Sequence, residues 1–96
     1  MKIILSNEAM QWFQEEMEAQ PGEYIRFYAR YGGSSPLHDG FSLGVTKEEP
    51  LELSIELVAE DIHFYIETRD EWYFDGHDLH VNVDPVLKEL TYSYSK

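Results

Sequence analysis

Residues 30–41 read Arg-Tyr-Gly-Gly-Ser-Ser-Pro-Leu-His-Asp-Gly-Phe and separate two segments in which apolar and polar side chains alternate. The first of these segments covers residues 25–29, and the second covers residues 41–45. Such alternation is typical of strands that have one buried face and one face in water. Because glycine adopts positive φ angles without a steric cost, Gly32 and Gly33 permit a turn between the two strands. We therefore predict a strand–turn–strand unit around this stretch.

A helix is expected near the N-terminus. Apolar residues recur at spacings of three and four between Ala9 and Met17, and glutamates occupy most of the positions opposite them. This period is typical of an amphipathic α-helix. Ser6 or Asn7 is a suitable N-cap, because a short polar side chain accepts a hydrogen bond from the first helical turn. We therefore predict a helix that ends before Pro21 and lays its apolar side on the rest of the chain.

Further strands are expected along the remainder of the chain. Strand-like patterns occur at residues 2–5, 51–57, 62–66, 79–83 and 91–95. Residues 68–74 indicate a short helical turn, and Asp75-Gly76 indicates a tight turn after it. We predict a single α+β domain that spans residues 1–96. In it, the N-terminal amphipathic helix packs on small sheets that are mostly antiparallel or mixed.

Net charge limits the kind of partner. The chain has 19 acidic and 7 basic residues among its 96, which gives a formal net charge of −12. Nucleic acids and anionic membrane surfaces repel such a chain, because binding to them depends on lysine and arginine. A protein partner with a basic surface is compatible with this charge. The chain contains no cysteine and shows no signal sequence or membrane-spanning apolar run, so we expect a cytoplasmic protein.

The stretch quoted above resembles a known signature. Arg-x-Gly-Gly at 30–33, with Gly-Phe at 40–41 opening the next strand, is similar to the Arg-Gly-Gly-Gly-Cys-Ser-Gly-Phe segment of the HesB/IscA-like (A-type iron–sulfur carrier) family. The resemblance continues in the strand and helix of residues 3–18. It continues also in Trp-Tyr-Phe-Asp-Gly at 72–76, where the family has a Leu-Asp-Gly element. It implies a HesB-like domain, and the chain resembles most the small cysteine-free members of YneR type.

Cluster carriage by this family's mechanism is not expected here. Ser34 stands where the family has a cysteine, and the family's Cys-Gly-Cys element has no counterpart in a chain without cysteine. Iron–sulfur clusters are held by soft thiolates, which a neutral serine hydroxyl does not replace. We therefore expect a non-enzymatic HesB/IscA-like domain without a cofactor, accessory to iron–sulfur biogenesis through partner or ligand binding. The partner implied is an iron–sulfur assembly factor or another protein with a basic surface.

The loop at 30–41 is the candidate binding site. Its backbone amides could form a nest that accepts a carboxylate or a phosphate. The residues concerned are Arg30, Gly32, Gly33, Ser34, Ser35 and His38. Alternatively, the glycines only permit the turn between the strands. A second candidate surface consists of tyrosines, several of them on the polar sides of strands, which act either as interface anchors or as cross-strand packing: Tyr24, Tyr28, Tyr31, Tyr65, Tyr92 and Tyr94.

A metal-binding protein is one alternative function. Two imidazoles and two carboxylates lie close together in one short segment, and these are ligand types that zinc and ferrous iron accept. The residues are Asp75, His77, Asp78 and His80. Alternation along a strand would, however, point His77 to the opposite side from Asp78 and His80. Ordinary turn and surface residues are the competing explanation.

A small hydrolase is a further alternative. Ser34 or Ser35 would supply the nucleophile and His38 the base, since the three residues are close in sequence. No Gly-x-Ser-x-Gly elbow accompanies them. We therefore rank this function below the other two.

Overall fold

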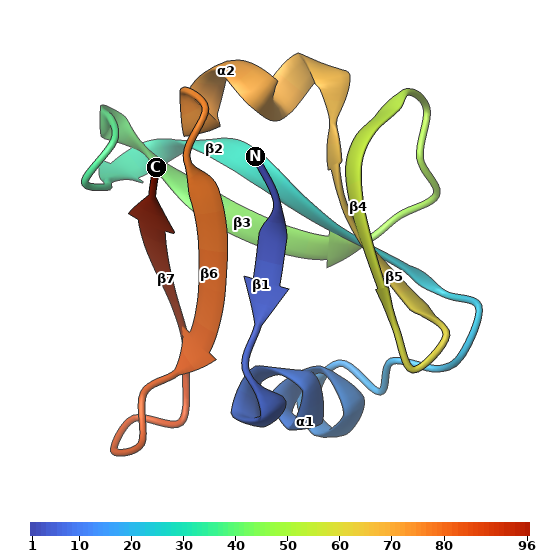
Figure 1. Ribbon diagram of the computed structural model, residues 1–96. Helices are drawn as coiled ribbons and strands as arrows, with labels where there is room; N and C mark the ends of the chain where they lie inside the picture. Colours follow the sequence, from blue (N-terminus) through green and yellow to red (C-terminus); the bar gives the residue numbers. More distant parts are fainter.

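The computed structural model describes residues 1–96 and contains two sheets, two α-helices and one short 3₁₀ helix (Figure 1). In chain order the elements are β1 (Ile3–Leu5), α1 (Asn7–Glu16), β2 (Tyr24–Ser34), β3 (Asp39–Lys47), β4 (Leu53–Ala59), β5 (Ile62–Glu67), η1 (Thr68–Asp70), α2 (Glu71–Phe74), β6 (Asp78–Val83) and β7 (Leu90–Ser95). One sheet has the strand order β1-β6-β7, and the other has the order β3-β2-β5-β4. The α+β class expected from the sequence is confirmed.

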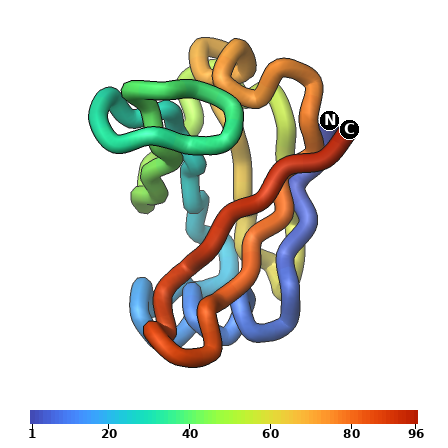
Figure 2. The backbone as a smooth tube through the Cα atoms, turned by 90° about the vertical axis from the view of Figure 1, so that its left-hand side faces the viewer, coloured from blue at the N-terminus to red at the C-terminus, as the bar shows by residue number.

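Both sheets are mixed. In the three-stranded sheet, β1 is parallel to β6 and β7 is antiparallel to it. In the four-stranded sheet, β2 is parallel to β5, whereas β3 and β4 are antiparallel to their neighbours. Helices α1 and α2 lie at opposite ends of the molecule (Figure 1), and both chain termini lie at the α2 end (Figure 2). Neither helix combines the length and the hydropathy that crossing a membrane requires.

The core is shared by α1 and both sheets, and Phe13 of α1 is central to it. Phe13 is fully buried, and its ring centroid lies 6.0 Å from that of Phe27 in β2 and 5.0 Å from that of Phe64 in β5. Ser6 caps the helix as expected, because its hydroxyl accepts the N–H of Ala9 at 3.0 Å. The apolar side of α1 therefore closes one end of the core.

A charged side chain is buried next to this core. Arg26, which the alternation places on the polar side of β2, is only 9% exposed. Its guanidinium donates from Nη2 to Asp70 and from Nη1 to Glu48, each at 2.7 Å. It also lies 5.3 Å from the ring centroid of Tyr28, a cation–π contact. Burial by itself lowers the pKa of Arg26, but the two carboxylates outweigh this and the pKa is raised.

Glu67 fixes the start of β4. Its carboxylate is buried and accepts the backbone N–H of Leu51 at 2.8 Å and that of Glu52 at 2.7 Å. Burial by itself raises the pKa of Glu67, but these hydrogen bonds, together with the charge of Arg26, bring the pKa below its usual value. Because both amides are bound to Glu67, the strand expected from residue 51 begins instead at Leu53.

Candidate functional site

The stretch 30–41 forms the end of the β2–β3 hairpin, in which residues 35–38 connect the two strands. Ser35 closes this turn, because its hydroxyl oxygen accepts the N–H of Leu37 at 3.3 Å and that of His38 at 3.2 Å. Its own backbone N–H donates to the carbonyl oxygen of His38 at 3.1 Å. The turn is therefore held by hydrogen bonds within the loop.

The glycine pair lies at an irregularity in the hairpin. Gly32 and Gly33 have φ angles of 116° and 68°, so the positive φ expected here is confirmed. The register shifts between Tyr31 and Ser34, as in a β-bulge. A β-carbon at Gly33 would meet only Ser42, at an ordinary contact distance of 3.5 Å. The backbone conformation, rather than a lack of space, therefore requires glycine at this position.

Gly33→Ala is expected to lower the free energy of unfolding by about 1–2 kcal/mol, because an L-residue pays that cost in a left-handed conformation. Ser34→Ala is the matched control, since Ser34 is exposed in the same bulge. It is expected to change the free energy of unfolding by less than about 0.5 kcal/mol. Urea denaturation measures both variants. Equal losses would contradict the assignment of the strain to Gly33.

An exposed aromatic patch lies beside this turn. We define the aromatic patch as Tyr31 of β2, Phe41 of β3 and Trp72 of α2. The ring centroid of Phe41 lies 5.6 Å from that of Tyr31 and 5.2 Å from that of Trp72, both in edge-on contacts. Tyr31 is 86% exposed and Trp72 is 50% exposed. Two segments far apart in sequence therefore build one continuous aromatic surface.

His38 and Tyr73 join the turn to α2 and hold the patch in place. The Nε2 atom of His38 lies 3.1 Å from the carbonyl oxygen of Tyr73, and the His38 ring lies 5.2 Å from that of Trp72. Tyr73 is fully buried, and its hydroxyl oxygen lies 3.2 Å from that of Tyr94 in β7. Because the buried Tyr73 holds α2 in place, the adjacent Trp72 loses little conformational freedom when a partner binds.

The aromatic patch has the composition of a protein-binding surface. Tyrosine and tryptophan are enriched at the energetic centres of interfaces, where their large rings exclude water. Sequence reasoning selected Tyr31 but missed Phe41, which occupies an apolar strand position, and Trp72. The run of aromatic residues at 72–74 was the available signal, because three consecutive side chains on a helix cannot all face the core. Tyr65, selected as a surface tyrosine, is fully buried.

The remaining candidates of the loop are placed apart. Arg30 is exposed on β2, where its Nη2 donates to the hydroxyl oxygen of Ser42 at 3.3 Å. Ser35 and His38 come together in the turn, but through the backbone of His38. A binding role stays a prediction for the six residues named from the sequence, which are Arg30, Gly32, Gly33, Ser34, Ser35 and His38.

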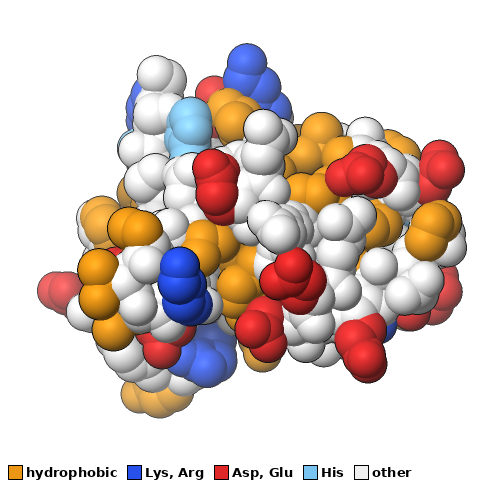
Figure 3. Space-filling model, turned by 90° about the horizontal axis from the view of Figure 1, so that it is seen from below, with side chains coloured by type: hydrophobic (Ala, Val, Ile, Leu, Met, Phe, Trp, Pro, Cys, Tyr) orange, Lys and Arg blue, Asp and Glu red, His pale blue; other side chains and the backbone are white.

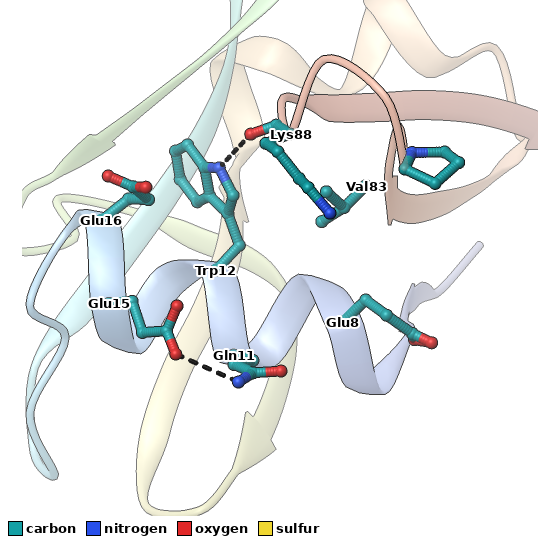
Figure 4. A pocket seen from close by; sticks show the side chains of 8 residues that line it. Glu8, Gln11, Trp12, Glu15, Glu16, Val83 and Lys88 are labelled. Carbon is teal, nitrogen blue, oxygen red and sulfur yellow. Dashed lines mark hydrogen bonds between the residues drawn. The ribbon is translucent and has the colours of Figure 1, made fainter.

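A second surface feature lies on the outer side of α1. It is a hollow of about 440 Å³ between α1, the end of β6 and the connection to β7 (Figure 4), and we name it the helix groove. Trp12 bridges it, since its Nε1 donates to the carbonyl oxygen of Lys88 at 3.1 Å. Figure 3, viewed from the α1 end, shows many acidic side chains on this face. The groove is lined by Glu8, Gln11, Trp12, Glu15, Glu16, Val83, Pro85 and Lys88.

The candidate metal ligands do not converge. His77 and His80 each have a partner of their own, a carbonyl oxygen of α2 and a hydroxyl of β7, both at 2.8 Å. Asp78 accepts the backbone N–H of Lys2 at 2.9 Å, and Asp75 is exposed in the turn. No group of three or more histidine, aspartate or glutamate side chains in the structure is arranged to hold a metal ion.

Known proteins match this chain along nearly its whole length. The chain is 40% identical over 94 residues to a Bacillus subtilis protein named pyruvate dehydrogenase inhibitor. The match covers 98% of this chain and 99% of that protein. The chain belongs to the family of that protein. It is also 38% identical over 96 residues to an uncharacterised Staphylococcus saprophyticus protein and 34% identical over 96 residues to one from Staphylococcus aureus, each match covering 97% of this chain and 98% of the relative. No family model and no solved structure matches the chain.

These relatives correct the family and the function expected from the sequence. Membership of the HesB/IscA-like family and a role accessory to iron–sulfur biogenesis are wrong, because no family model matches and the Bacillus subtilis relative is named for the inhibition of pyruvate dehydrogenase. The resemblance depended on a short glycine motif. Gly32 and Gly33 have a local explanation in the bulge of the hairpin, which any hairpin of this geometry requires.

The two alternative functions are not supported either. The metal-binding alternative lacks a set of converging ligands. In the hydrolase alternative, the ring of His38 contacts the carbonyl oxygen of Tyr73 rather than a serine hydroxyl. The hydroxyl of Ser35 contacts the backbone of the turn. A nucleophile needs a base within hydrogen-bond reach, which this arrangement does not supply.

Proposed function

We propose that this protein is a cytoplasmic regulator that binds and inhibits a pyruvate dehydrogenase. The observation that carries the proposal is the 40% identity to the Bacillus subtilis pyruvate dehydrogenase inhibitor over nearly the full length of both chains. Inhibition of an enzyme by a small protein requires a surface that recognises it. The aromatic patch supports such a role, because its rings are large and in mutual contact, Tyr31 and Trp72 are exposed, and the buried Tyr73 holds α2.

The contact is assigned to the aromatic patch on physical grounds. Covering Tyr31 and Trp72 removes much apolar surface from water, which is the dominant favourable contribution to protein association. The net charge of −12 adds a long-range attraction to a basic region of the enzyme and speeds the encounter. The hydrophobic contact and the charge therefore contribute to affinity and to association rate, respectively.

Inhibition assays on purified pyruvate dehydrogenase from the organism that encodes the chain test the proposal. The wild-type protein is expected to lower the rate of the enzyme in a saturable manner. Tyr31→Ala and Trp72→Ala should each raise the half-inhibitory concentration about 30-fold, the effect of losing an interface hot spot. Val58→Ala is the matched control, because Val58 is also 50% exposed but lies on β4.

Two outcomes contradict different parts of the proposal. If the wild-type protein leaves the enzyme rate unchanged and does not bind the enzyme, the proposed function is wrong. If the wild-type protein inhibits and the Tyr31 and Trp72 variants inhibit equally well, the function stands and the aromatic patch is not the contact. Melting temperatures of all variants must first agree with the wild type, so that loss of folding is not mistaken for loss of binding.

A further inference from the structure

The helix groove combines a hollow, an aromatic side chain and three glutamates that form no ion pair. Trp12 stands between the helix and the connection from β6 to β7 (Figure 4), with its Nε1 fixed on the backbone of Lys88. Glu8, Glu15 and Glu16 line the same hollow, and none of them takes part in any ion pair of the structure. Glu15 accepts a hydrogen bond from the side-chain amide of Gln11 at 3.0 Å, which leaves its charge without a counterion. A cation placed over the indole would therefore meet carboxylates whose charge is not neutralised.

The position of Glu15 and Glu16 on α1 is electrostatically unfavourable in the protein alone. Glu15 and Glu16 occupy the last turn of the helix, which contains no basic residue. The C-terminal end of a helix carries a partial negative charge, so acidic side chains there repel it and basic ones are favoured. A lysine or arginine supplied from outside would relieve this repulsion. The groove is therefore complementary in charge to a basic ligand.

The rim of the groove is apolar and ordered. Val86 and Leu87 lie beside the lining residues in the connection after β6, and they are 83% and 65% exposed. The side chain of Asp84 fixes them, because its Oδ1 accepts the backbone N–H of both residues at 2.8 Å. Because the backbone is held at both residues, their exposed aliphatic side chains offer apolar contact without the cost of ordering the loop.

We propose that the helix groove docks a short protein segment in which lysine or arginine stands next to large aliphatic residues. The cation lies over Trp12 and between Glu15 and Glu16, and the aliphatic residues cover Val86 and Leu87. The side chain of Lys88 lies on the opposite wall (Figure 4), so the cation approaches from the helix side. This surface is distinct from the aromatic patch, and the proposal does not depend on the inhibition of any enzyme.

Fluorescence titration of the intact protein tests the docking. The variant Trp72→Phe leaves Trp12 as the only tryptophan, so that emission reports on the groove alone. The probe is a short capped peptide in which lysine and leucine alternate, and the control peptide has glutamate in place of lysine. A saturable change in emission is expected with the lysine peptide only. It should weaken at about 1 M salt, where the screening length falls to about 3 Å.

Substitutions that remove negative charges show where the peptide binds. In the Trp72→Phe protein, the pair Glu15→Gln and Glu16→Gln is expected to raise the dissociation constant of the lysine peptide about 2- to 30-fold, the range for two exposed ion pairs. The pair Glu49→Gln and Glu52→Gln makes the same charge change outside the groove and should leave the constant unchanged.

Three results would overturn the proposal. The first is an emission that does not saturate with the lysine peptide. The second is equal binding of the glutamate peptide. The third is an equal weakening by the two pairs of substitutions, which would show a general charge effect rather than a site. Leu87→Ser supplies a further check, because it leaves the charge intact and should still weaken binding if the aliphatic rim takes part.

Discussion

Asp70→Ala is expected to lower the free energy of unfolding by about 3–5 kcal/mol, because it leaves a buried charge on Arg26 without its buried partner. Asp70 is 6% exposed and Arg26 is 9% exposed, so water does not replace the lost carboxylate. The Nε of Arg26 already has no hydrogen-bond partner. The carboxylate that remains belongs to Glu48, whose side chain is 41% exposed. Equilibrium unfolding in urea measures the change.

Two companion variants show whether burial is the cause. Glu48→Ala removes the exposed partner of Arg26 and is expected to cost about 1 kcal/mol or less. The double variant Arg26→Met with Asp70→Leu removes both buried charges, and it should recover much of the stability that Asp70→Ala loses. If Asp70→Ala costs no more than Glu48→Ala, or if the double variant is less stable than Asp70→Ala, the buried pair does not have the role given to it here.

Phe13→Ala is expected to lower the free energy of unfolding by about 3–5 kcal/mol, the range for a large aromatic side chain removed from a packed core. Phe13 is fully buried and contacts the rings of Phe27 and Phe64, which belong to neighbouring strands of one sheet. A small protein has a total stability of about 5–15 kcal/mol, so the loss takes a large share. In a thermal melt, it corresponds to a decrease in Tm of about 12 °C or more.

A graded series of variants keeps this prediction testable if Phe13→Ala fails to fold. Phe13→Leu keeps most of the buried volume and should cost about 1–1.5 kcal/mol. Gln14 is the next residue of the same helix and is exposed. Gln14→Ala should therefore change the free energy of unfolding by less than about 0.5 kcal/mol. Comparable losses in Phe13→Ala and Gln14→Ala would contradict the assignment of the loss to packing on the sheet, because alanine is the better helix former at both positions.

The candidate surfaces were only partly predictable. A hairpin was expected with its turn at Gly32 and Gly33, but these glycines lie in a bulge within β2 and the turn is formed by residues 35–38. Tyr31 was among the selected tyrosines. The aromatic patch also needs Phe41 and Trp72, and Trp72 comes close only because α2 packs against the turn through His38. The helix groove has the same origin, since α1 meets a connection more than seventy residues further along the chain. Sequence patterns describe neighbours along the chain and do not report such contacts.

The sequence by itself determined the local structure. The helix with its Ser6 cap, the helical turn at residues 68–74 and the positive φ of Gly33 appear where the patterns predict them. The strands with alternating side chains do so to within a few residues, as β4 shows by beginning at Leu53 instead of Leu51. Each depends on residues within a few positions of one another, through hydrogen bonds, side-chain period or backbone sterics. The net charge of −12 likewise follows from composition alone.

Only the tertiary structure decided which elements meet. A period of two shows which side chains share a face but does not identify the neighbouring strand. The parallel pairing of β1 with β6 places Ile3 opposite Leu79, and the parallel pairing of β2 with β5 has no sequence signal of its own. The burial of Arg26 against Asp70 follows from these pairings, because an exposed strand position becomes buried once another element covers it.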